Sequence, residues 1–575
     1  MHSWVSILAI WVGLAAGYQE PPPLRVVYFV PSDCDPLPHY QERVDRVMTE
    51  VQRFYREGMQ AAGYGPTTFS LERDDQDRLR LYLVRGRYPM REYGRNDAAK
   101  VRREVKDALT QQGIDADRET IVIFQVLLAW EGGRATEVGP YVGGGNHLSG
   151  TAWVYDDPRL DPQLLPSKEP GGYYNGPCSL GQFNTHYIGG TAYELGHAFG
   201  LPHDCETRAE RSVRGRSLMG SGNHTYGREL RNEGPGTFLS EASAMQLFGT
   251  RPFSGELPDA RVRPTCLLKA LDADFEAGRM VLTGTLEARP SAFGVVALND
   301  GAAQPADYDA VGWTAKVDEQ GRFRVEIGEL QPGRSQLRLR VCHINGAQSV
   351  FAFDYDVDAG GRPRLDVFRM RVPLGEAMRA FAARDRSRLK DLVADCRDRF
   401  ADLPELEKRL AHLLRLVDAA PPRPLAEVPP DRDGWVPISG AVFRSATTGW
   451  GRPLRDQVLM ERGEPCFIQV DGQFFENGLF AHAPSKYELE IGGKFARFRT
   501  GYGLQDGHEG SVVFVVRGDD RELFRSPLIR DAKLRDIDVN VEGIRVLELL
   551  VETGDDGPSG DWGVWIEPRL RPTAN

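Results

Sequence analysis

A short run of residues near position 200 combines side chains that can bind a metal ion and move a proton. Tyr193 and His197 are four residues apart, and in a helix this spacing places both side chains on one face. Glu194 lies beside that face, where its carboxylate could take a proton from water activated by a metal. Gly200 can leave the helix with a positive φ and turn the chain so that His203 approaches the same point. The spacing therefore predicts three ligand positions and one general base.

The run Y-E-L-G-H-A-F-G-L-P-H-D at 193–204 resembles the metzincin metallopeptidases, whose pattern is H-E-x-x-H-x-x-G-x-x-H followed by a methionine turn. The matching residues are Glu194, His197, Gly200 and His203. S-L-M-G at 217–220 is a candidate methionine turn, in which the family places a residue such as Met219 beneath the metal. The resemblance implies a zinc-dependent peptidase with His197 and His203 as ligands and Glu194 as the general base.

The sequence departs from this pattern at Tyr193, where the family has its first histidine ligand. A phenol has a reference pKa of about 10, so the metal must supply the energy that deprotonates it. Its ring is also longer than imidazole and can crowd the metal. Three outcomes stay open: Tyr193 is a ligand, another histidine completes the site, or the domain is a pseudopeptidase that keeps only the fold. The candidate replacement ligands are His147, His186 and His224.

Length, charge and the first residues limit the classes of function. A chain of 575 residues exceeds one hydrophobic core and predicts several domains. A net charge of −11 argues against nucleic acid as a partner, because phosphate binding needs clustered Lys and Arg. Residues 1–17 resemble a secretory signal peptide, with a buried strand or an uncleaved anchor as the alternative. We therefore expect a secreted, periplasmic or cell-surface protein with no membrane span after signal removal.

The cysteines contain no C-x-x-C pair, which excludes a zinc ribbon and a redox motif of that type. Export would allow disulfides, and Cys178 with Cys205 and Cys266 with Cys342 are the candidate pairs. A simple buried cysteine is the default expectation for each. The seven cysteines are Cys34, Cys178, Cys205, Cys266, Cys342, Cys396 and Cys466.

The predicted elements divide the chain into a multidomain α+β protein. Residues 18–255 alternate strands and helices, which suits a metzincin-like α/β domain whose edge strand binds a peptide substrate; the glycine-rich run 142–146 is expected to be a loop near that edge. The pattern of residues 263–371 predicts the short strands of a β-sandwich, which would be a spacer or an interaction module. Residues 373–420 predict a short helical segment of two helices, and the prolines of 421–432 predict a stiff linker.

Residues 433–573 carry a second resemblance. The segments N-G-L-F-A-H-A-P-S at 477–485, G-S-V-V-F-V-V at 510–516 and G-D-W-G-V-W at 560–565 are similar to the NPCBM carbohydrate-binding modules, which have a galactose-binding-like β jelly roll. The resemblance implies glycan binding by aromatic rings and polar groups in loops, and a structural calcium ion. The candidate sugar contacts are Trp450, Tyr502, Asp506, His508, Asp561, Trp562 and Trp565, although Trp565 and His482 are equally well explained as core residues.

The combined prediction is a secreted zinc-dependent metallopeptidase that hydrolyses the peptide bonds of a peptide or protein substrate and is held near a polysaccharide-rich surface by its glycan-binding module. The alternative is a catalytically degenerate metzincin that acts as a non-enzymatic carbohydrate-binding or adhesion protein. A glycosidase is poorly supported, because it needs a pair of carboxylates that the sequence does not reveal.

Overall fold

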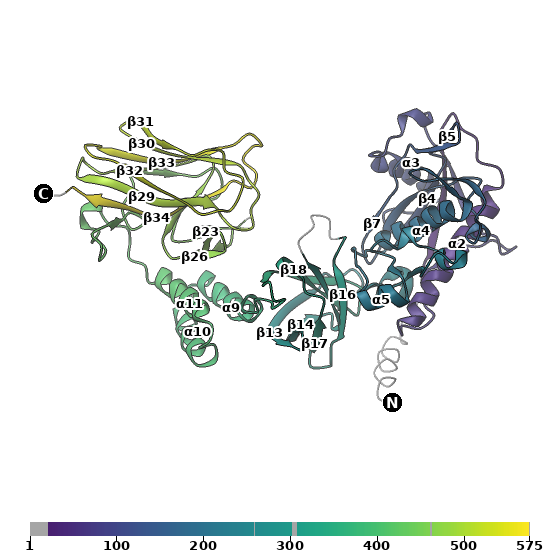
Figure 1. The fold of residues 1–575 in the computed structure, drawn as a ribbon, viewed down its shortest axis with the longest axis horizontal. Helices are drawn as coiled ribbons and strands as arrows, with labels where there is room; N and C mark the ends of the chain where they lie inside the picture. Colours follow the sequence, from purple (N-terminus) through teal and green to yellow (C-terminus); the bar gives the residue numbers. More distant parts are fainter. Residues whose placement is uncertain (1–20, 258, 302–307, 461–462, 574–575) are drawn as a thin grey trace. The chain divides into compact units, whose positions relative to one another are not determined.

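The computed structural model describes residues 21–257, 259–301, 308–460 and 463–573, and it divides into two units, residues 1–369 and 370–575 (Figure 1). The first unit holds the predicted peptidase-like domain and the β-sandwich, and the second holds the helical segment and the C-terminal module. The predicted signal peptide, residues 1–17, lies outside the described residues. No helix within the described ranges is long and apolar enough to cross a membrane.

The first domain is built on a six-stranded sheet of order β2-β1-β4-β8-β7, with β3 also paired to β1. Neighbouring strands in this sheet are parallel, except that β7 is antiparallel to β8. Helices cover both faces of this sheet, and alternate residues of β1 point to opposite faces. Val26 and Tyr28 pack with α2 and α4 on one face, whereas Val27 and Phe29 pack with α3 on the other. The strands are β1 (Pro23–Val30), β2 (Ser70–Leu71), β3 (Leu81–Arg85), β4 (Thr120–Gln125), β7 (Val142–Gly145) and β8 (Gly150–Tyr155).

The predicted alternation of strands and helices is confirmed in this domain. β4 ends at Gln125, and Leu128 begins the hairpin of β5 (Leu128–Glu131) and β6 (Arg134–Glu137). The longer helices are α2 (Tyr40–Ala61), α3 (Ala98–Thr110) and α4 (Leu180–Ala198). The smaller elements are β9 (Pro170–Tyr173), β10 (Pro177–Ser179), α5 (Arg208–Val213), β11 (Arg216–Ser217), β12 (Thr237–Phe238), α6 (Glu241–Phe248) and α7 (Arg251–Ser254).

The glycine-rich run is the antiparallel edge strand β7, so its prediction as a loop was wrong. Glycine is unfavourable inside strands, and the sequence alone gives no reason for it here. The structure supplies the reason: a Cβ on Gly143 would lie 1.9 Å from the backbone oxygen of Glu194 on α4. Glycine therefore lets the edge strand lie directly against the helix that carries the candidate site.

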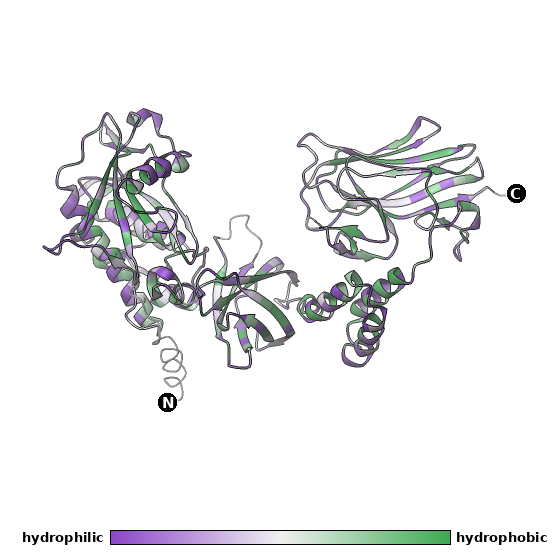
Figure 2. Ribbon diagram, turned by 180° about the vertical axis from the view of Figure 1, so that it is seen from behind, coloured by the Kyte–Doolittle hydropathy of each residue, from purple (hydrophilic) through white to green (hydrophobic). Residues whose placement is uncertain are grey.

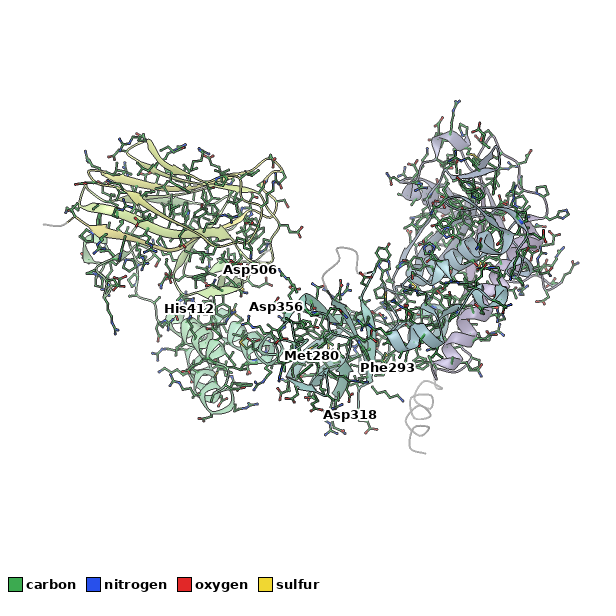
Figure 3. The ribbon with its side chains drawn as sticks, viewed as in Figure 1. Met280, Phe293, Asp318, Asp356, His412 and Asp506 are labelled. Atoms are coloured by element: carbon green, nitrogen blue, oxygen red, sulfur yellow. The ribbon has the colours of Figure 1, made fainter. Side chains whose placement is uncertain are left out.

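The β-sandwich consists of a three-stranded sheet, β13-β14-β17, and a four-stranded sheet, β16-β15-β18-β19. Met280 on β14 is fully buried between them, whereas Asp318 lies in an exposed turn (Figure 3). The strands are β13 (Thr265–Glu276), β14 (Arg279–Arg289), β15 (Ala292–Gly301), β16 (Val311–Lys316), β17 (Arg322–Ile327), β18 (Gly333–His343) and β19 (Gln348–Val357), followed by the short helix α8 (Asp366–Arg369).

The sandwich shares a hydrophobic cluster with the first domain. Ala242 and Met245 of α6 pack with Val296, Leu298 and further apolar residues of the sandwich. Arg340 of β18 also donates a hydrogen bond to the side chain of Gln246 at 2.8 Å. The two domains of the first unit therefore meet through a packed interface.

The helical segment contains three helices, where the sequence predicted two. They are α9 (Arg371–Ala382), α10 (Arg386–Arg399) and α11 (Pro404–Val417), and each carries both hydrophobic and hydrophilic residues (Figure 2). The missed break lies at Arg384, which has a left-handed φ of 53°, and at Asp385, whose carboxylate caps α10 by accepting from the Arg388 N–H at 3.0 Å. α11 begins at Pro404, and proline is well tolerated in the first turn of a helix.

The C-terminal module has two antiparallel sheets, of orders β22-β27-β34-β29-β32 and β21-β28-β33-β30-β31. Its longer strands are β27 (Gly478–His482), β28 (Ser485–Glu490), β29 (Phe495–Leu504), β30 (Val512–Gly518), β31 (Arg521–Arg525), β32 (Arg535–Asn540), β33 (Val546–Thr553) and β34 (Trp562–Pro572), and its shorter ones are β20 (Val436–Pro437), β21 (Ser445–Thr447), β22 (Leu454–Arg455), β23 (Val458–Leu459), β24 (Pro465–Cys466), β25 (Ile468–Val470) and β26 (Gln473–Phe475). The proline-rich segment 421–432 packs onto this module, because Arg423 pairs with Ala441 and both Leu425 and Val428 contact its core.

Candidate functional site

The helix α4 carries Tyr193, Glu194 and His197 and is almost entirely buried. It begins with a capping box between Ser179 and Gln182, which satisfies backbone groups that the first turn leaves unpaired. It ends at Ala198, and Gly200 has a φ of 90°. The predicted left-handed exit at Gly200 is thus confirmed, and it turns the chain toward His203.

Three aromatic rings converge at the end of α4. The ring centroids of Tyr193 and His197 are 4.8 Å apart, those of His197 and His203 are 4.9 Å apart, and those of Tyr193 and His203 are 6.2 Å apart. The residues that the sequence predicted as ligand positions therefore come together in space. We call this group the three-ring cluster.

The His197 ring is oriented as a metal ligand would be. Its Nδ1 lies 2.9 Å from the backbone oxygen of Leu201, which can only accept, so Nδ1 carries the proton and Nε2 keeps a free lone pair. A hydrogen bond of this kind fixes the tautomer of metal-binding histidines. A donor set of two imidazoles and one phenol can hold a metal once the phenol has lost its proton, so the residues present fit such an ion.

None of the three replacement histidines joins this cluster. His147 Nε2 is bonded to the backbone oxygen of Ala260 at 3.0 Å, while His186 and His224 stack on each other with their centroids 5.3 Å apart. Across the described part of the chain, no three His, Cys, Asp or Glu side chains are grouped so that they could hold a metal ion. Any metal at α4 would therefore depend on Tyr193.

Glu194 is buried beside the three-ring cluster. Burial raises the pKa of its carboxyl to about 7, and a hydrogen bond from the Gly143 N–H partly opposes that change. The edge strand β7 thus holds the carboxylate with its own backbone. A carboxyl group with a pKa near neutrality can both accept and return a proton, which general acid–base catalysis requires.

Met219 and Asp204 support the loop around His203. Met219 is fully buried beneath α4, where a Cβ on Gly196 would lie 2.4 Å from its sulfur. The buried carboxylate of Asp204 accepts hydrogen bonds from the hydroxyls of three serines at 2.5 to 2.8 Å, namely Ser217, Ser240 and Ser243. These bonds connect the residue after His203 to the predicted methionine turn and to α6.

Tyr193 has a partner that the sequence analysis missed. Its hydroxyl is hydrogen-bonded to that of Tyr308, which belongs to the β-sandwich, and the Tyr308 ring stacks on His203 with centroids 3.9 Å apart. Burial, with Tyr308 and Glu194 nearby, raises the pKa of Tyr193 well above its usual value. More than one hundred residues separate Tyr308 from the α4 motif, and no spacing rule connects them.

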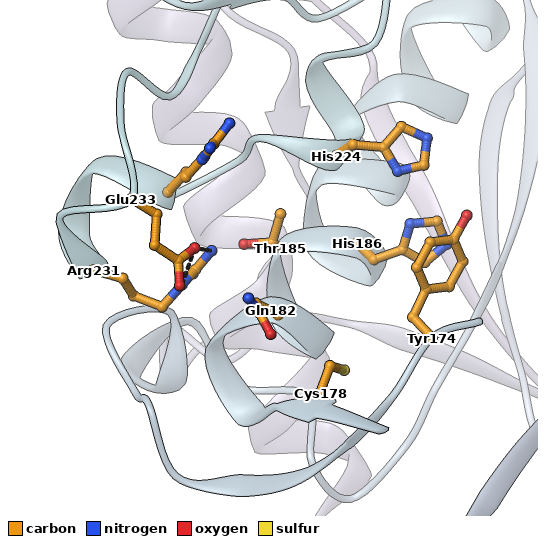
Figure 4. Close-up of a pocket in the computed structure, with 9 residues that line it drawn as sticks. Tyr174, Cys178, Gln182, Thr185, His186, His224, Arg231 and Glu233 are labelled. Atoms are coloured by element: carbon orange, nitrogen blue, oxygen red, sulfur yellow. Dashed lines mark hydrogen bonds and ion pairs between the residues drawn. The ribbon is translucent and has the colours of Figure 1, made fainter. Parts of the chain in front are cut away.

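A pocket of about 690 Å³ opens along the same helix (Figure 4). His186 lies seven residues before Tyr193, which places it on the same face of α4 and about 10 Å away along the axis. Tyr174 stacks on His186 with centroids 3.3 Å apart, and burial lowers the pKa of His186 to about 3. The remaining lining residues are polar or charged for the most part: Cys178, Gln182, Thr185, His224, Arg228, Arg231 and Glu233.

A second pocket, of about 750 Å³, lies in the C-terminal module. Trp562 lines this pocket, and its ring is stacked on His508 at a centroid distance of 4.1 Å and lies 5.3 Å from the ring of Trp450. His482 packs edge-on against the same tryptophan at 4.6 Å. Two acidic residues, Glu509 and Asp556, also line the pocket. The pocket thus combines aromatic faces with polar groups, as sugar sites do.

Residues 435–571 match the family described as NPCBM/NEW2 domain. The C-terminal module is an NPCBM domain. Wild-type OgpA from Akkermansia muciniphila has a similar structure, at 23% identity and a TM-score of 0.52 over 59% of this chain and 95% of that chain. The structure of catalytically inactive OgpA in complex with an O-glycopeptide (glycodrosocin) substrate is also similar, at 22% identity and a TM-score of 0.51 over 59% of this chain and 94% of that chain. At these identities the likeness shows a shared fold.

A third match is the M60 catalytic domain with the CBM51-1 and CBM51-2 domains of Clostridium perfringens ZmpB, at 13% identity and a TM-score of 0.23 over 72% of this chain and 44% of that chain. No curated protein matches the sequence.

The NPCBM domain brings some of the predicted sugar contacts together and places others elsewhere. Trp450, His508 and Trp562 line its pocket. Trp565 and Tyr502 are buried in the hydrophobic core, so the structure corrects their proposed role as sugar contacts. The remaining two are occupied in local hydrogen bonds, because Asp506 accepts from the Gly472 N–H at 2.9 Å and Asp561 accepts from the Ser511 N–H at 2.9 Å.

All seven cysteines are free thiols. Neither candidate disulfide, Cys178 with Cys205 or Cys266 with Cys342, is formed. Cys178 lines the pocket beside α4, and the Cys205 thiol donates a hydrogen bond to the backbone oxygen of Tyr308 at 2.7 Å.

Proposed function

We propose that the protein is a peptidase-like protein that acts on glycosylated proteins, with the NPCBM domain binding their glycans. The observation that carries this proposal is the convergence of Tyr193, His197 and His203 beside the buried carboxyl of Glu194. The shared fold with OgpA, which was solved with an O-glycopeptide substrate, supports the same substrate class. Zinc is the metal that the metzincin-like motif implies, with Tyr193, His197 and His203 as the residues that would hold it.

In this proposal the chain's own groups position the peptide and transfer the proton. A bound metal would supply Lewis-acid activation of the reacting groups. Glu194 would take a proton from the attacking water and return it to the leaving amine, a role that suits a pKa of about 7. The edge strand β7 would bind an extended peptide by strand addition, since β7 is the last strand on that side of the sheet.

The pocket beside α4 would accept a polar group of the substrate close to the cleaved bond. Its stacked rings, Tyr174 and His186, offer a flat face, and Arg228 and Glu233 in its lining can form hydrogen bonds. A sugar has both a flat apolar face and many hydroxyls, so this lining suits a glycosylated side chain better than a purely hydrophobic one.

A direct test combines metal analysis with glycopeptide cleavage. The protein is purified, its metal content is measured by mass spectrometry, and its cleavage of a mixed library of glycosylated and unglycosylated peptides is followed by mass spectrometry. We expect stoichiometric metal, cleavage of glycopeptides and loss of cleavage in Glu194→Gln. The matched control is Glu131→Gln, which changes an exposed carboxylate at the end of β5 and should leave cleavage unchanged.

A second candidate is a non-catalytic glycoprotein-binding protein that keeps a degenerate peptidase domain. The observation that favours it is the buried, hydrogen-bonded hydroxyl of Tyr193, whose raised pKa opposes metal binding. It would be supported if the natural protein contained no stoichiometric metal and cleaved no glycopeptide, while Tyr193→His bound zinc and cleaved. A glycan array with the full-length protein and with Trp450→Ala tests the binding function, which both candidates share.

A further inference from the structure

Tyr308 is fixed against the three-ring cluster by its own backbone. The Cys205 N–H donates to the backbone oxygen of Ala310 at 2.6 Å, and the Cys205 thiol donates to that of Tyr308 at 2.7 Å. Cys205 also forms a parallel β-bridge with Val311. Because Cys205 lies two residues after His203, these bonds attach the sandwich directly to the loop that carries the third ring.

The side chain of Tyr308 contacts two members of the cluster at once. Its ring stacks on His203 with an interplanar angle of 23°, and its hydroxyl meets the hydroxyl of Tyr193. Two phenol oxygens are therefore hydrogen-bonded to each other, and their rings lie among those of His197 and His203. One of these oxygens comes from the α4 helix and the other from the neighbouring domain.

We propose that Tyr308 is the fourth member of the metal centre, which is then a centre of two phenols and two imidazoles assembled across two domains. This inference rests on the metal centre proposed above and specifies its composition. Such a donor set suits a hard, highly charged ion, ferric iron, better than zinc. Two phenolates bring two negative charges, and hard oxygen anions are matched by hard cations, whereas imidazole accepts either ion.

Binding of ferric iron would form two iron–oxygen bonds to the phenols and two iron–nitrogen bonds to the imidazoles. The two phenol protons pass to solvent, and no electron is transferred. A trivalent ion is better able to displace these protons than a divalent one, because its attraction for each oxygen anion is greater.

The test is a titration of the full-length, chelator-treated protein with ferric nitrilotriacetate and, separately, with zinc sulfate. We expect one ferric ion per chain and a visible phenolate-to-iron charge-transfer band. Tyr308→Phe keeps the ring on His203 and removes only the hydroxyl, so it should weaken the band and lower the ferric affinity on the order of 10- to 100-fold. Tyr193→Phe should do the same. Tyr88→Phe, which changes a 40% exposed tyrosine of the same domain, is the control for the band.

The possible results separate this inference from the proposed metal centre. A band that Tyr193→Phe weakens but Tyr308→Phe leaves unchanged refutes the role of Tyr308 and keeps the centre. Stoichiometric zinc with no ferric band refutes the two-phenol composition and also keeps the centre. Binding of neither ion refutes both. Thermal melting of each variant verifies folding, and Tyr308 is half exposed, so loss of its hydroxyl should leave the melting temperature close to that of the natural protein.

Discussion

Replacement of Glu194 by glutamine should change how the stability of the metal-free protein depends on pH. Burial raises the pKa of this carboxyl from 4.5 to about 7 in the folded state. Below pH 4.5 the folded and unfolded states both carry the proton. As the pH rises from 4.5 to 7, the unfolded state loses its proton more readily, so the folded state loses stability, and the loss is complete above pH 7. Glutamine has no proton to lose and removes this effect.

The size of the effect follows from the difference between the two pKa values. Each pKa unit corresponds to about 1.4 kcal/mol, so the change from 4.5 to about 7 corresponds to roughly 3 kcal/mol at pH 8.5. In domains of 150–250 residues, about 1 kcal/mol moves the melting temperature by roughly 2–4 °C. We therefore expect Glu194→Gln to melt about 6–12 °C above the natural protein at pH 8.5 and close to it at pH 4.5. The amide oxygen of glutamine can still accept from the Gly143 N–H, so the comparison isolates the charge.

The assay is thermal unfolding of both proteins between pH 4.5 and 8.5 after treatment with a chelator, followed by circular dichroism. Glu131→Gln serves as the control, because this exposed carboxylate should give a difference that is small at every pH. A difference for Glu194→Gln that stayed constant across the range would refute the buried-carboxyl explanation. A metal added at pH 8.5 should reduce the difference, because a nearby cation stabilises the ionised carboxylate.

Three further changes test the supports of the site and the glycan pocket. Gly143→Ala would place a Cβ 1.9 Å from the Glu194 backbone oxygen, so we expect a loss of about 1–3 kcal/mol in chemical denaturation, against no measurable loss for Gly144→Ala, whose Cβ meets no atom within 4 Å. Asp204→Ala would remove the acceptor shared by three serine hydroxyls, and we expect a loss of about 3 kcal/mol or more in the same measurement, with a smaller loss for Asp204→Asn. Trp450→Ala should weaken glycan binding at least tenfold in calorimetry without changing the melting temperature, because its ring lines the pocket and is only partly buried.

Local periodicity and motif spacing were enough to predict much of the first domain and the cluster on α4. The α2 and α3 helices follow from hydrophobic residues repeated at helical spacing, and the convergence of Tyr193, His197 and His203 follows from helix geometry and one glycine. The same reasoning failed at Gly143, where the need for glycine comes from contact with a helix that lies fifty residues further along the chain. Local propensity has no access to such a contact.

The residues that sequence reasoning missed come from segments outside the α4 motif, and tertiary packing brings them to the site. Tyr308 reaches the cluster because the sandwich bridges to Cys205, and Tyr174 reaches the pocket because its hairpin packs along α4. In the NPCBM domain, composition alone could not separate Trp562, which lines a pocket, from Trp565, which is buried in the core. The two tryptophans are three residues apart on one strand, and only the packing of the two sheets distinguishes them.

The tyrosine at position 193 is easier to understand together with Tyr308 than by itself. A histidine at position 193 would be shorter than tyrosine and would withdraw from the Tyr308 hydroxyl, which then loses the partner that it has in this structure. The sandwich is also attached at Cys205, beside His203, so the position of Tyr308 does not depend on residue 193 alone. The two tyrosines therefore form a pair whose members come from different domains. Because of this pairing, we expect Tyr193→His and Tyr308→Phe to have non-additive effects on metal affinity, as for groups that share one site.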